Sequence, residues 1–367
     1  MAYDINDLLI KSNKAGASDI HLNCGKAPAL RINGEIFKVA GDVITHNDIF
    51  SILEKTLPKE YCKSIEQLKD IDYIYEVPDV ARFRVNFCKD IHYGKMTFRT
   101  IPYSIKTLKE LHLPEYLEEF TRINNGIVFV TGATGSGKST TLASLIDIIN
   151  ANDKKHIVTI EDPVEFVYNE KKSIVTQRSL DIDVKDFKTG IKYALRQDPD
   201  VILVGEIRDP DTLLSAIEAA ETGHIVYSTL HTNGTVASID RLRGILEEGN
   251  QEQFLKRLAH CVRGVIHQQL IPTKTDGKLI PALEILTFTP TVVDYVKDNK
   301  LLDVQHLMQR SKQPNIVTMN MALFDLYQKD IITKEAALAH SLDKVEMEQF
   351  IRGIYKGSAQ EEEHRTN

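Results

Sequence analysis

The chain has 367 residues, of which 42% are hydrophobic and 26% charged, a composition typical of a folded protein of about two domains. Its net charge of −7 gives no general attraction to nucleic acid, so we expect no nucleic-acid partner. No run of about 18 apolar residues and no cleavage-site pattern is present, so we expect a cytoplasmic protein without a membrane span. The cysteines are far apart in sequence and form no C-x-x-C pair, which predicts reduced, mostly buried thiols: Cys24, Cys62, Cys88 and Cys261.

The first hundred residues predict a small α+β unit. Apolar spacing predicts helices at 3–15, 45–57 and 58–69. Short alternating segments predict strands at 18–23, 27–34, 70–77, 81–90 and 94–101, with Asn33 and Gly34 turning a hairpin.

Three arginines stand out on the strands of this unit. Arg82 and Arg84 are two residues apart and therefore face the same side of a strand, and Arg99 follows on an expected neighbouring strand. The residues alone leave two interpretations open, a solvated sheet face or a cluster that faces phosphate.

Pro102 and Pro114 interrupt a connector. After it, the sequence pattern becomes that of an α/β protein. Apolar strands alternate with helical stretches, which predicts a doubly wound parallel sheet. The expected strands are 127–131, 156–162, 200–205 and 224–230.

The pattern G-x-x-x-x-G-K-S runs from Gly132 to Ser139, between the first of these strands and a helix. At such a junction, backbone N–H groups and the helix N-terminus bind phosphate, Lys138 reaches the β and γ phosphates, and the Ser139 hydroxyl binds Mg²⁺. The alternative is a chance glycine-rich turn. We expect nucleotide binding.

Acidic residues follow two of the other strands. Glu206 comes after Gly205, which ends the apolar run at 201–204. The strand before it ends in Glu161 and Asp162, and Glu165 follows. Because the carboxyl ends of parallel strands meet at one edge, these acids are expected near the phosphates, where one carboxylate serves a cation and another polarises water. The division of these roles stays open, as does a plain helix-start role for Glu206.

Two histidines flank the strand at 225–230. His231, at its carboxyl end, is placed to sense a γ-phosphate, with Thr229, Thr232 and Asn233 as alternatives; a structural role is the other interpretation. No further ligands lie near His224 and His231, so we expect no zinc.

The last third predicts a long helix at 252–270, a strand at 279–286, and helices from about residue 289 to Tyr355. The polar segment 357–367 is expected to be disordered.

Four segments in order, GATGSGKSTT, TIEDPVEF, LRQDPDVILVGEIRD and TGHIVYSTLHTN, resemble the Walker A, aspartate-box, Walker B and histidine-box motifs of secretion ATPases. GASDIHL and RFRVN with FRTIP are similar to the PilT-like type IV pilus retraction ATPases. The resemblance spans roughly residues 3 to 290.

This resemblance implies a PAS-like domain at 1–101, a linker at 102–118, a RecA-like ATPase domain with C-terminal helices at 119–356 and a tail at 357–367. It implies a hexamer that binds ATP and Mg²⁺, with the metal held by Ser139 and Glu206. The nucleotide-binding residues implied are Gly132, Ala133, Thr134, Gly135, Ser136, Gly137, Lys138, Ser139 and Thr140. The catalytic residues implied are Glu206, Glu165, His231, His224, Arg82, Arg84 and Arg99.

The implied function is a motor at the cytoplasmic face of the inner membrane that acts through a platform protein and removes pilin. We expect neither the extra N-terminal domain nor the four-cysteine zinc motif usual in assembly ATPases, and this expectation favours retraction. Where retraction ATPases typically carry A-I-R-N-L-I-R-E-G-K, this chain has TVVDYVKDNK at 291–300. A divergent accessory paralogue that assists a principal retraction ATPase is therefore one alternative.

Other classes fit less well. A non-catalytic nucleotide-binding scaffold would bind ATP tightly without turnover, but Glu206 and Glu165 are retained. A small-molecule kinase would need an acceptor pocket and a lid, and a GTPase would carry an N-K-x-D signature.

Overall fold

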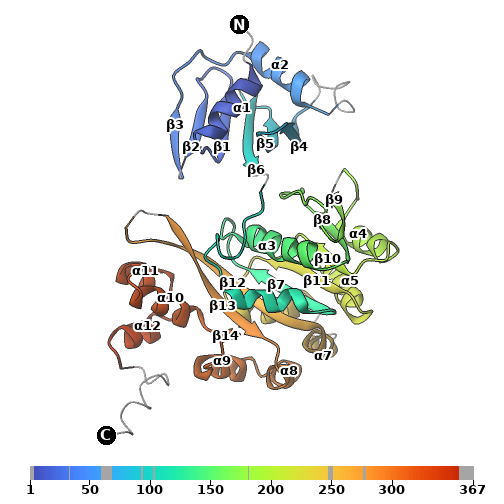
Figure 1. Cartoon of the computed structure of the whole chain (residues 1–367), viewed down its shortest axis with the longest axis vertical. Helices are drawn as coiled ribbons and strands as arrows, with labels where there is room; N and C mark the ends of the chain where they lie inside the picture. Colours follow the sequence, from blue (N-terminus) through green and yellow to red (C-terminus); the bar gives the residue numbers. More distant parts are fainter. Residues whose placement is uncertain are drawn as a thin grey trace. The chain divides into compact units, whose positions relative to one another are not determined.

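The computed structural model of the chain describes residues 4–32, 34–58, 68–91, 94–101, 104–180, 182–246, 251–275 and 278–354. The chain divides into two compact units, Met1–Ser104 and Ile105–Asn367 (Figure 1). Each unit has its own sheet and its own hydrophobic core.

The first unit is an antiparallel sheet with strand order β3-β2-β1-β6-β5-β4. Its strands are β1 (Asp19–Asn23), β2 (Ala29–Ile32), β3 (Glu35–Lys38), β4 (Asp70–Val77), β5 (Ala81–Cys88) and β6 (Lys95–Ile101). Helices α1 (Ile5–Lys14) and α2 (His46–Thr56) begin at caps, because the side chains of Asp4 and Thr45 accept hydrogen bonds from backbone N–H groups of the first turn.

Side chains of this sheet alternate between an apolar and a polar face. Phe83 and Val85 of β5 are buried in a core shared with α1 and α2, whereas Arg82 and Arg84 alternate with them and face the other side. Arg84 pairs directly with Arg99 of β6, so the three arginines share the polar face. The predicted placement of these arginines is confirmed.

The second unit contains a mixed sheet with strand order β14-β13-β12-β7-β11-β10-β8-β9. Strands β12, β7, β11, β10, β8 and β9 run parallel, and β13 and β14 join the β12 edge in antiparallel pairs. Their bounds are β7 (Gly126–Thr131), β8 (His156–Glu161), β9 (Ile174–Ser179), β10 (Val201–Val204), β11 (Ile225–Leu230), β12 (Val262–Pro272), β13 (Leu279–Thr287) and β14 (Ile316–Val317). The sequence pattern does not predict β9.

Helices cover both faces of the parallel strands. Ile127 and Phe129 of β7 lie in a core with α4, α5 and α7, while Val128 and Val130 lie in a core with α3 and η2. A strand buried on both faces is apolar at every position, which is why the sequence predicts it correctly. The bounds are η2 (Glu115–Arg122), α3 (Lys138–Asn152), α4 (Phe187–Ala194), α5 (Pro210–Glu221), α6 (Thr235–Gly244) and α7 (Gln251–Cys261).

The C-terminal part is largely helical, as expected. It comprises α8 (Pro290–Lys297), α9 (Leu301–Arg310), α10 (Met319–Gln328), α11 (Lys334–His340) and α12 (Lys344–Ile351), with the short strand β14 between α9 and α10. At the other end of the second unit, Leu108, Leu113 and Leu117 are buried in the core on the α3 side.

The prediction of one helix over 252–270 is wrong. Helix α7 ends at Cys261, and β12 begins at the next residue. The backbone of β12 pairs with β7 on one side and β13 on the other, so nonlocal hydrogen bonds decide its conformation. At Gly264 a Cβ atom would lie 2.2 Å from the ring of Phe120, which packs directly on the strand.

Several expectations fall outside the described residues: the turn at Asn33, most of the helix expected at 58–69, Cys62, Pro102, Tyr355 and the tail at 357–367. The thiols of Cys24, Cys88 and Cys261 are free. Over the described ranges, no helix combines the length and apolar character needed to cross a bilayer.

Candidate active site

The glycine-rich segment forms the turn between β7 and α3, as predicted. Gly132, Gly135 and Gly137 have φ angles of +141°, +79° and +86°, a region that residues with a Cβ atom rarely adopt. No side chain caps the N-terminus of α3, which begins at Lys138. The turn therefore offers backbone N–H donors together with the positive end of a helix, an arrangement that fits phosphate.

Lys138 folds back over this turn. Its Nζ atom donates to the carbonyl oxygens of Gly132 and Ala133, each at 2.9 Å, and the residue is 8% exposed. Burial lowers the pKa of Lys138, while the carboxylates of Glu206 and Glu165 favour its charged form. The structure thus brings the lysine and both predicted carboxylates into one electrostatic environment.

Gln268 of β12 also contacts the turn, and the sequence interpretation missed it. Its Nε2 atom donates to the carbonyl oxygen of Ser136 at 2.7 Å, and its Oε1 atom accepts from the Thr141 hydroxyl at 2.7 Å. The residue is 3% exposed. A buried polar residue within an apolar strand is a signal for such a role, but the helix prediction for 252–270 concealed it.

Glu206 lies just beyond β10 and is 13% exposed in its side chain. Its Oε2 atom lies 2.7 Å from Nε of Arg208 and 3.3 Å from Nε2 of His231. The structure therefore brings His231 to Glu206, because the two parallel strands end at the same edge of the sheet. Arg208, which is bonded to the same carboxylate, was not predicted.

The acids after β8 differ in their environments. Burial raises the pKa of Glu161 to about 7, hydrogen bonds from Thr159, the Glu165 backbone and Gln177 oppose the rise, and the charge of Glu165 adds to it. The Thr159 hydroxyl donates to Oε1 of Glu161 at 2.6 Å. Of these acids, Glu165 is the one whose charge reaches Lys138.

His224 does not join this site within one chain. It precedes β11, whereas His231 follows it, so the two histidines lie roughly 20 Å apart along the strand. Nδ1 of His224 lies 2.9 Å from the carbonyl oxygen of Ala219 and 3.2 Å from the Thr222 hydroxyl. A contribution of His224 to catalysis therefore stays a prediction that requires a second subunit.

The threonines near His231 have structural partners. The Thr229 hydroxyl donates to the carbonyl oxygen of Gly205 at 2.6 Å, which joins the ends of β11 and β10. The Thr232 and Ser238 hydroxyls lie 2.6 Å apart. His231 is thus the residue of this group that contacts an acidic strand end.

A buried carboxylate fixes the helix that follows His231. Oε1 of Glu284 accepts from the backbone N–H of Thr235 at 2.6 Å and from its hydroxyl at 2.8 Å, and Oε2 accepts from the N–H of Met319 at 3.1 Å. Thr235 and Met319 are the first residues of α6 and α10. His267 pairs with Glu284 across β12 and β13, and burial lowers the pKa of His267 while Glu284 opposes the change.

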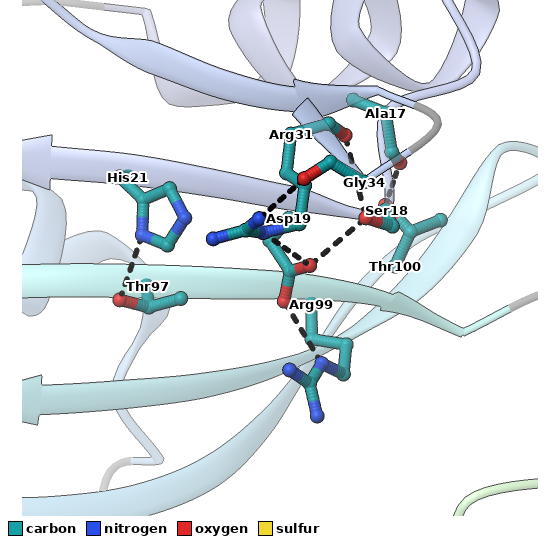
Figure 2. Close-up of polar contacts among 9 residues, drawn as sticks. All are labelled: Ala17, Ser18, Asp19, His21, Arg31, Gly34, Thr97, Arg99 and Thr100. Carbon is teal, nitrogen blue, oxygen red and sulfur yellow. Dashed lines mark hydrogen bonds and ion pairs between the residues drawn. The ribbon is translucent and has the colours of Figure 1, made fainter. Parts of the chain in front are cut away.

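In the first unit, each arginine of the polar face has an acidic neighbour. Nε of Arg82 lies 3.7 Å from Glu76, and Nε of Arg84 lies 3.7 Å from Asp72. Nε of Arg99 lies 2.8 Å from the carboxylate of Asp19. Figure 2 shows Asp19 between Arg99 and Arg31, the latter with its Nε atom at 3.9 Å.

The oxygen-bearing side chains near the glycine-rich turn at 132–137, called the phosphate turn below, suit a cation that is bound mainly by phosphate and water. Ser139 is exposed at the start of α3, and Glu206 supplies one carboxylate. Within the ranges that the structure describes, no group of three or more His, Cys, Asp or Glu residues is placed to hold a metal. Mg²⁺ typically binds through one or two protein oxygens together with phosphate and water, which these residues suit.

Residues 79–337 match the Type II/IV secretion system protein family. The type IV pilus retraction ATPase PilT of Pseudomonas aeruginosa is 37% identical over 91% of this chain and 97% of that protein. A twitching motility protein of Neisseria gonorrhoeae is 36% identical over 92% of this chain and 90% of that protein. The type IV pilus ATPase PilU of Pseudomonas aeruginosa is 33% identical over 89% and 85% of the two chains.

Solved structures agree. The crystal structure of the pilus retraction motor PilT with bound ADP has a TM-score of 0.88 and 38% identity, and the match covers 95% of this chain and 99% of that one. The ATPase DotB of Legionella pneumophila gives a TM-score of 0.79 at 28% identity over 91% and 94% of the two chains. With its mixed α/β fold, its phosphate turn and the carboxylates beside it, the chain belongs to the Type II/IV secretion system protein family, as a PilT-like ATPase.

Proposed function

We propose that this chain is a hexameric, Mg-ATP-driven motor that powers type IV pilus retraction and twitching motility. The observation that carries the proposal is the glycine-rich turn before α3, onto which the buried amine of Lys138 folds. The charges of Glu206 and Glu165 act on that amine. The chain in which this occurs is similar to the retraction motor PilT over nearly its whole length.

In this proposal, residues 132–140 hold the phosphates of ATP. The Nζ atom of Lys138, now bonded to two carbonyl oxygens of its own turn, would exchange them for phosphate oxygens, and Ser139 would hold Mg²⁺. When bound, Mg²⁺ neutralises charge on the β and γ phosphates. One of Glu206 and Glu165 would orient the attacking water and take up its proton, and the other would help to hold the cation.

The proposed movement comes from a ring of two-domain subunits. Residues 1–101 form a PAS-like domain, 102–118 a linker, 119–356 a RecA-like domain and 357–367 a tail. The PAS-like domain packs on the RecA-like domain of the next subunit, and Arg82, Arg84 and Arg99 approach the phosphates. In support, all three arginines share one polar sheet face. Hydrolysis at a boundary between domains then changes their orientation.

The proposed place of work is the cytoplasmic face of the inner membrane, on a pilus platform protein through which pilin subunits are removed. The relatives that carry this proposal are named as a pilus retraction ATPase and a twitching motility protein.

A second candidate is an accessory paralogue that works with a principal retraction ATPase. The segment 291–300 keeps its helix, and Val292 and Val296 are fully buried, but its outer positions depart from the pattern typical of retraction ATPases. At one outer position the charge is kept, because Lys297 stands where the pattern has Arg, and Lys297 pairs with Asp294 of the same helix at 3.2 Å.

Deletion and complementation separate these candidates. We expect pilus retraction to stop in a deletion strain of the source organism and to return with the wild-type chain but not with Glu206→Gln, which keeps the shape of the side chain and removes its charge. Retraction that persists after deletion would favour the accessory role. Restoration by Glu206→Gln would contradict a motor whose work depends on hydrolysis.

A further inference from the structure

Gln268 of β12 contacts the phosphate turn near both of its ends. A Cβ atom on Gly132 would lie 2.4 Å from the backbone oxygen of Gln268, and a Cβ atom on Gly137 would lie 2.7 Å from its Nε2 atom. The backbone of Gln268 therefore leaves no room for a side chain at Gly132, and its amide group lies against Gly137.

The hydrogen bonds of Gln268 have only one consistent arrangement. The carbonyl oxygen of Ser136 can only accept, so the amide nitrogen of Gln268 must face it, at 2.7 Å. The amide oxygen then faces the Thr141 hydroxyl, which donates at 2.7 Å. Because the residue is 3% exposed, water offers little replacement for either partner.

The bond to Ser136 determines the direction of the next backbone N–H. In a trans peptide unit, the carbonyl oxygen and the following N–H point in opposite directions. With the Ser136 oxygen held toward Gln268, the N–H of Gly137 points away from β12. We propose that Gln268 is a positioning residue for nucleotide binding: it keeps the Ser136–Gly137 peptide in the orientation that presents this N–H to phosphate.

The proposal rests on the nucleotide site assigned above to 132–140, and it adds a residue that contacts no reacting atom. Loss of the Gln268 amide would let the peptide turn over, since glycine at 137 permits the required backbone angles. The peptide would then have to reorient before the turn could bind phosphate. The free-energy cost of this reorientation weakens the affinity, although every group that touches the nucleotide is still present.

Gln269 provides a matched control. It is the adjacent residue of the same strand and points to the opposite face. Its Nε2 atom donates to the carbonyl oxygen of His340 at 3.3 Å, and its Oε1 atom lies 3.1 Å from Nδ1 of His340, so it bonds to α11 and not to the turn.

The test is the dissociation constant of fluorescent ADP with Mg²⁺, measured on the full chain together with its thermal unfolding. We expect Gln268→Met to raise the dissociation constant about tenfold, to lower the melting temperature without nucleotide because two buried groups lose their hydrogen-bond partner, and to raise KM for ATP more than it lowers kcat. Gln269→Met should leave ADP affinity unchanged. Equal affinities of Gln268→Met and wild type would overturn the proposal, as would equal losses in both glutamine variants.

Two further variants keep the result interpretable. Lys138→Ala tests the site itself: if it also leaves ADP affinity unchanged, the nucleotide site is assigned wrongly, whereas loss in Lys138→Ala alone rejects only the role of Gln268.

Should Gln268→Met fail to fold, Thr141→Val decides, because it removes the donor to Oε1 while keeping the shape of the side chain. We expect it to weaken ADP binding about threefold, and unchanged binding would reject the proposal.

Discussion

Nε of Arg99 lies 2.8 Å from Oδ1 of Asp19, whose side chain is only 7% exposed, while the arginine side chain is 63% exposed (Figure 2). Asp19 thus holds the inner nitrogen of the guanidinium. The bond leaves the two terminal nitrogens of Arg99 toward solvent, in the orientation that suits an anion.

Replacing Arg99 with Ala tests whether this face meets the nucleotide. We expect kcat for ATP hydrolysis to fall roughly a hundredfold, as when one preorganised donor to a transition state is removed. Circular dichroism should be unchanged, because the side chain is mostly exposed. Arg31→Ala is the control, since Arg31 also neighbours Asp19 but bonds to the Gly34 carbonyl at 2.6 Å. Normal kinetics for Arg99→Ala would return the arginines to the solvated-face interpretation.

Glu161 predicts a pH dependence of stability. The unfolded chain releases this proton near its ordinary pKa of 4.5, whereas burial keeps it bound in the fold up to about 7. Stability therefore falls as pH rises between these values, by about 3 kcal/mol in total. Glu161→Gln mimics the protonated side chain, so it should match the wild type in acid and exceed it above about pH 7 in urea unfolding. Parallel pH profiles for the two proteins would contradict the assigned pKa.

The two ends of the phosphate turn were predictable because their signals are local. The apolar run at 127–131, the glycines and the helical spacing after Lys138 are contiguous, and each element satisfies its own pattern. Arg82 and Arg84 were placed correctly for the same reason, since a spacing of two residues fixes a strand face. Asp19, by contrast, is 80 residues from Arg99, and only strand pairing brings them together.

Gly132 and Gly135 should respond differently to substitution by Ala. Both have positive φ angles, which cost a Cβ-bearing residue about 1–2 kcal/mol. A Cβ atom on Gly135 meets nothing within 4 Å, whereas one on Gly132 also collides with the backbone of Gln268. We expect Gly132→Ala to lower the free energy of unfolding without nucleotide by about 3–5 kcal/mol. Gly135→Ala should lower it only by the cost of the positive φ angle. Equal losses of unfolding free energy in the two variants would show that strand β12 can move away from Gly132.

Glu284 should contribute strongly to stability. Glu284→Ala leaves the N–H groups of Thr235 and Met319 buried without their acceptor, at a cost of about 3 kcal/mol. Glu252→Ala is the control, since Glu252 is exposed and pairs with Lys256 of the same helix; its urea midpoint should not move. A Glu284→Ala midpoint equal to the wild type would mean that α6 and α10 are held by other contacts.

The strand β12 shows where sequence interpretation failed. Leu258, Val262 and Val265 are spaced four and three residues apart, which suits a helix, yet the chain leaves the helix at Cys261. The strand is selected by pairing with β7, which lies more than a hundred residues earlier, and with β13. No local pattern contains that information, and the role of Gln268 was lost with it.

His224 lies at the far end of β11 from His231, whereas the family resemblance implies a catalytic role for it. If a second subunit supplies His224 to the phosphate site, a His224→Ala ring and a Lys138→Ala ring should each hydrolyse ATP poorly. Mixing the two subunits should restore part of the activity, because some sites then combine an intact Lys138 from one subunit with an intact His224 from its neighbour.

The measurement is the ATP turnover of the mixed rings. It is compared with each variant alone and with a mixture of His231→Ala and Glu206→Gln subunits. His231 and Glu206 are in contact within one chain, at 3.3 Å, so that control mixture should gain nothing. Absence of recovery in the first mixture, with both variants assembled, would place the function of His224 within its own subunit, where its contacts to Ala219 and Thr222 indicate a structural role.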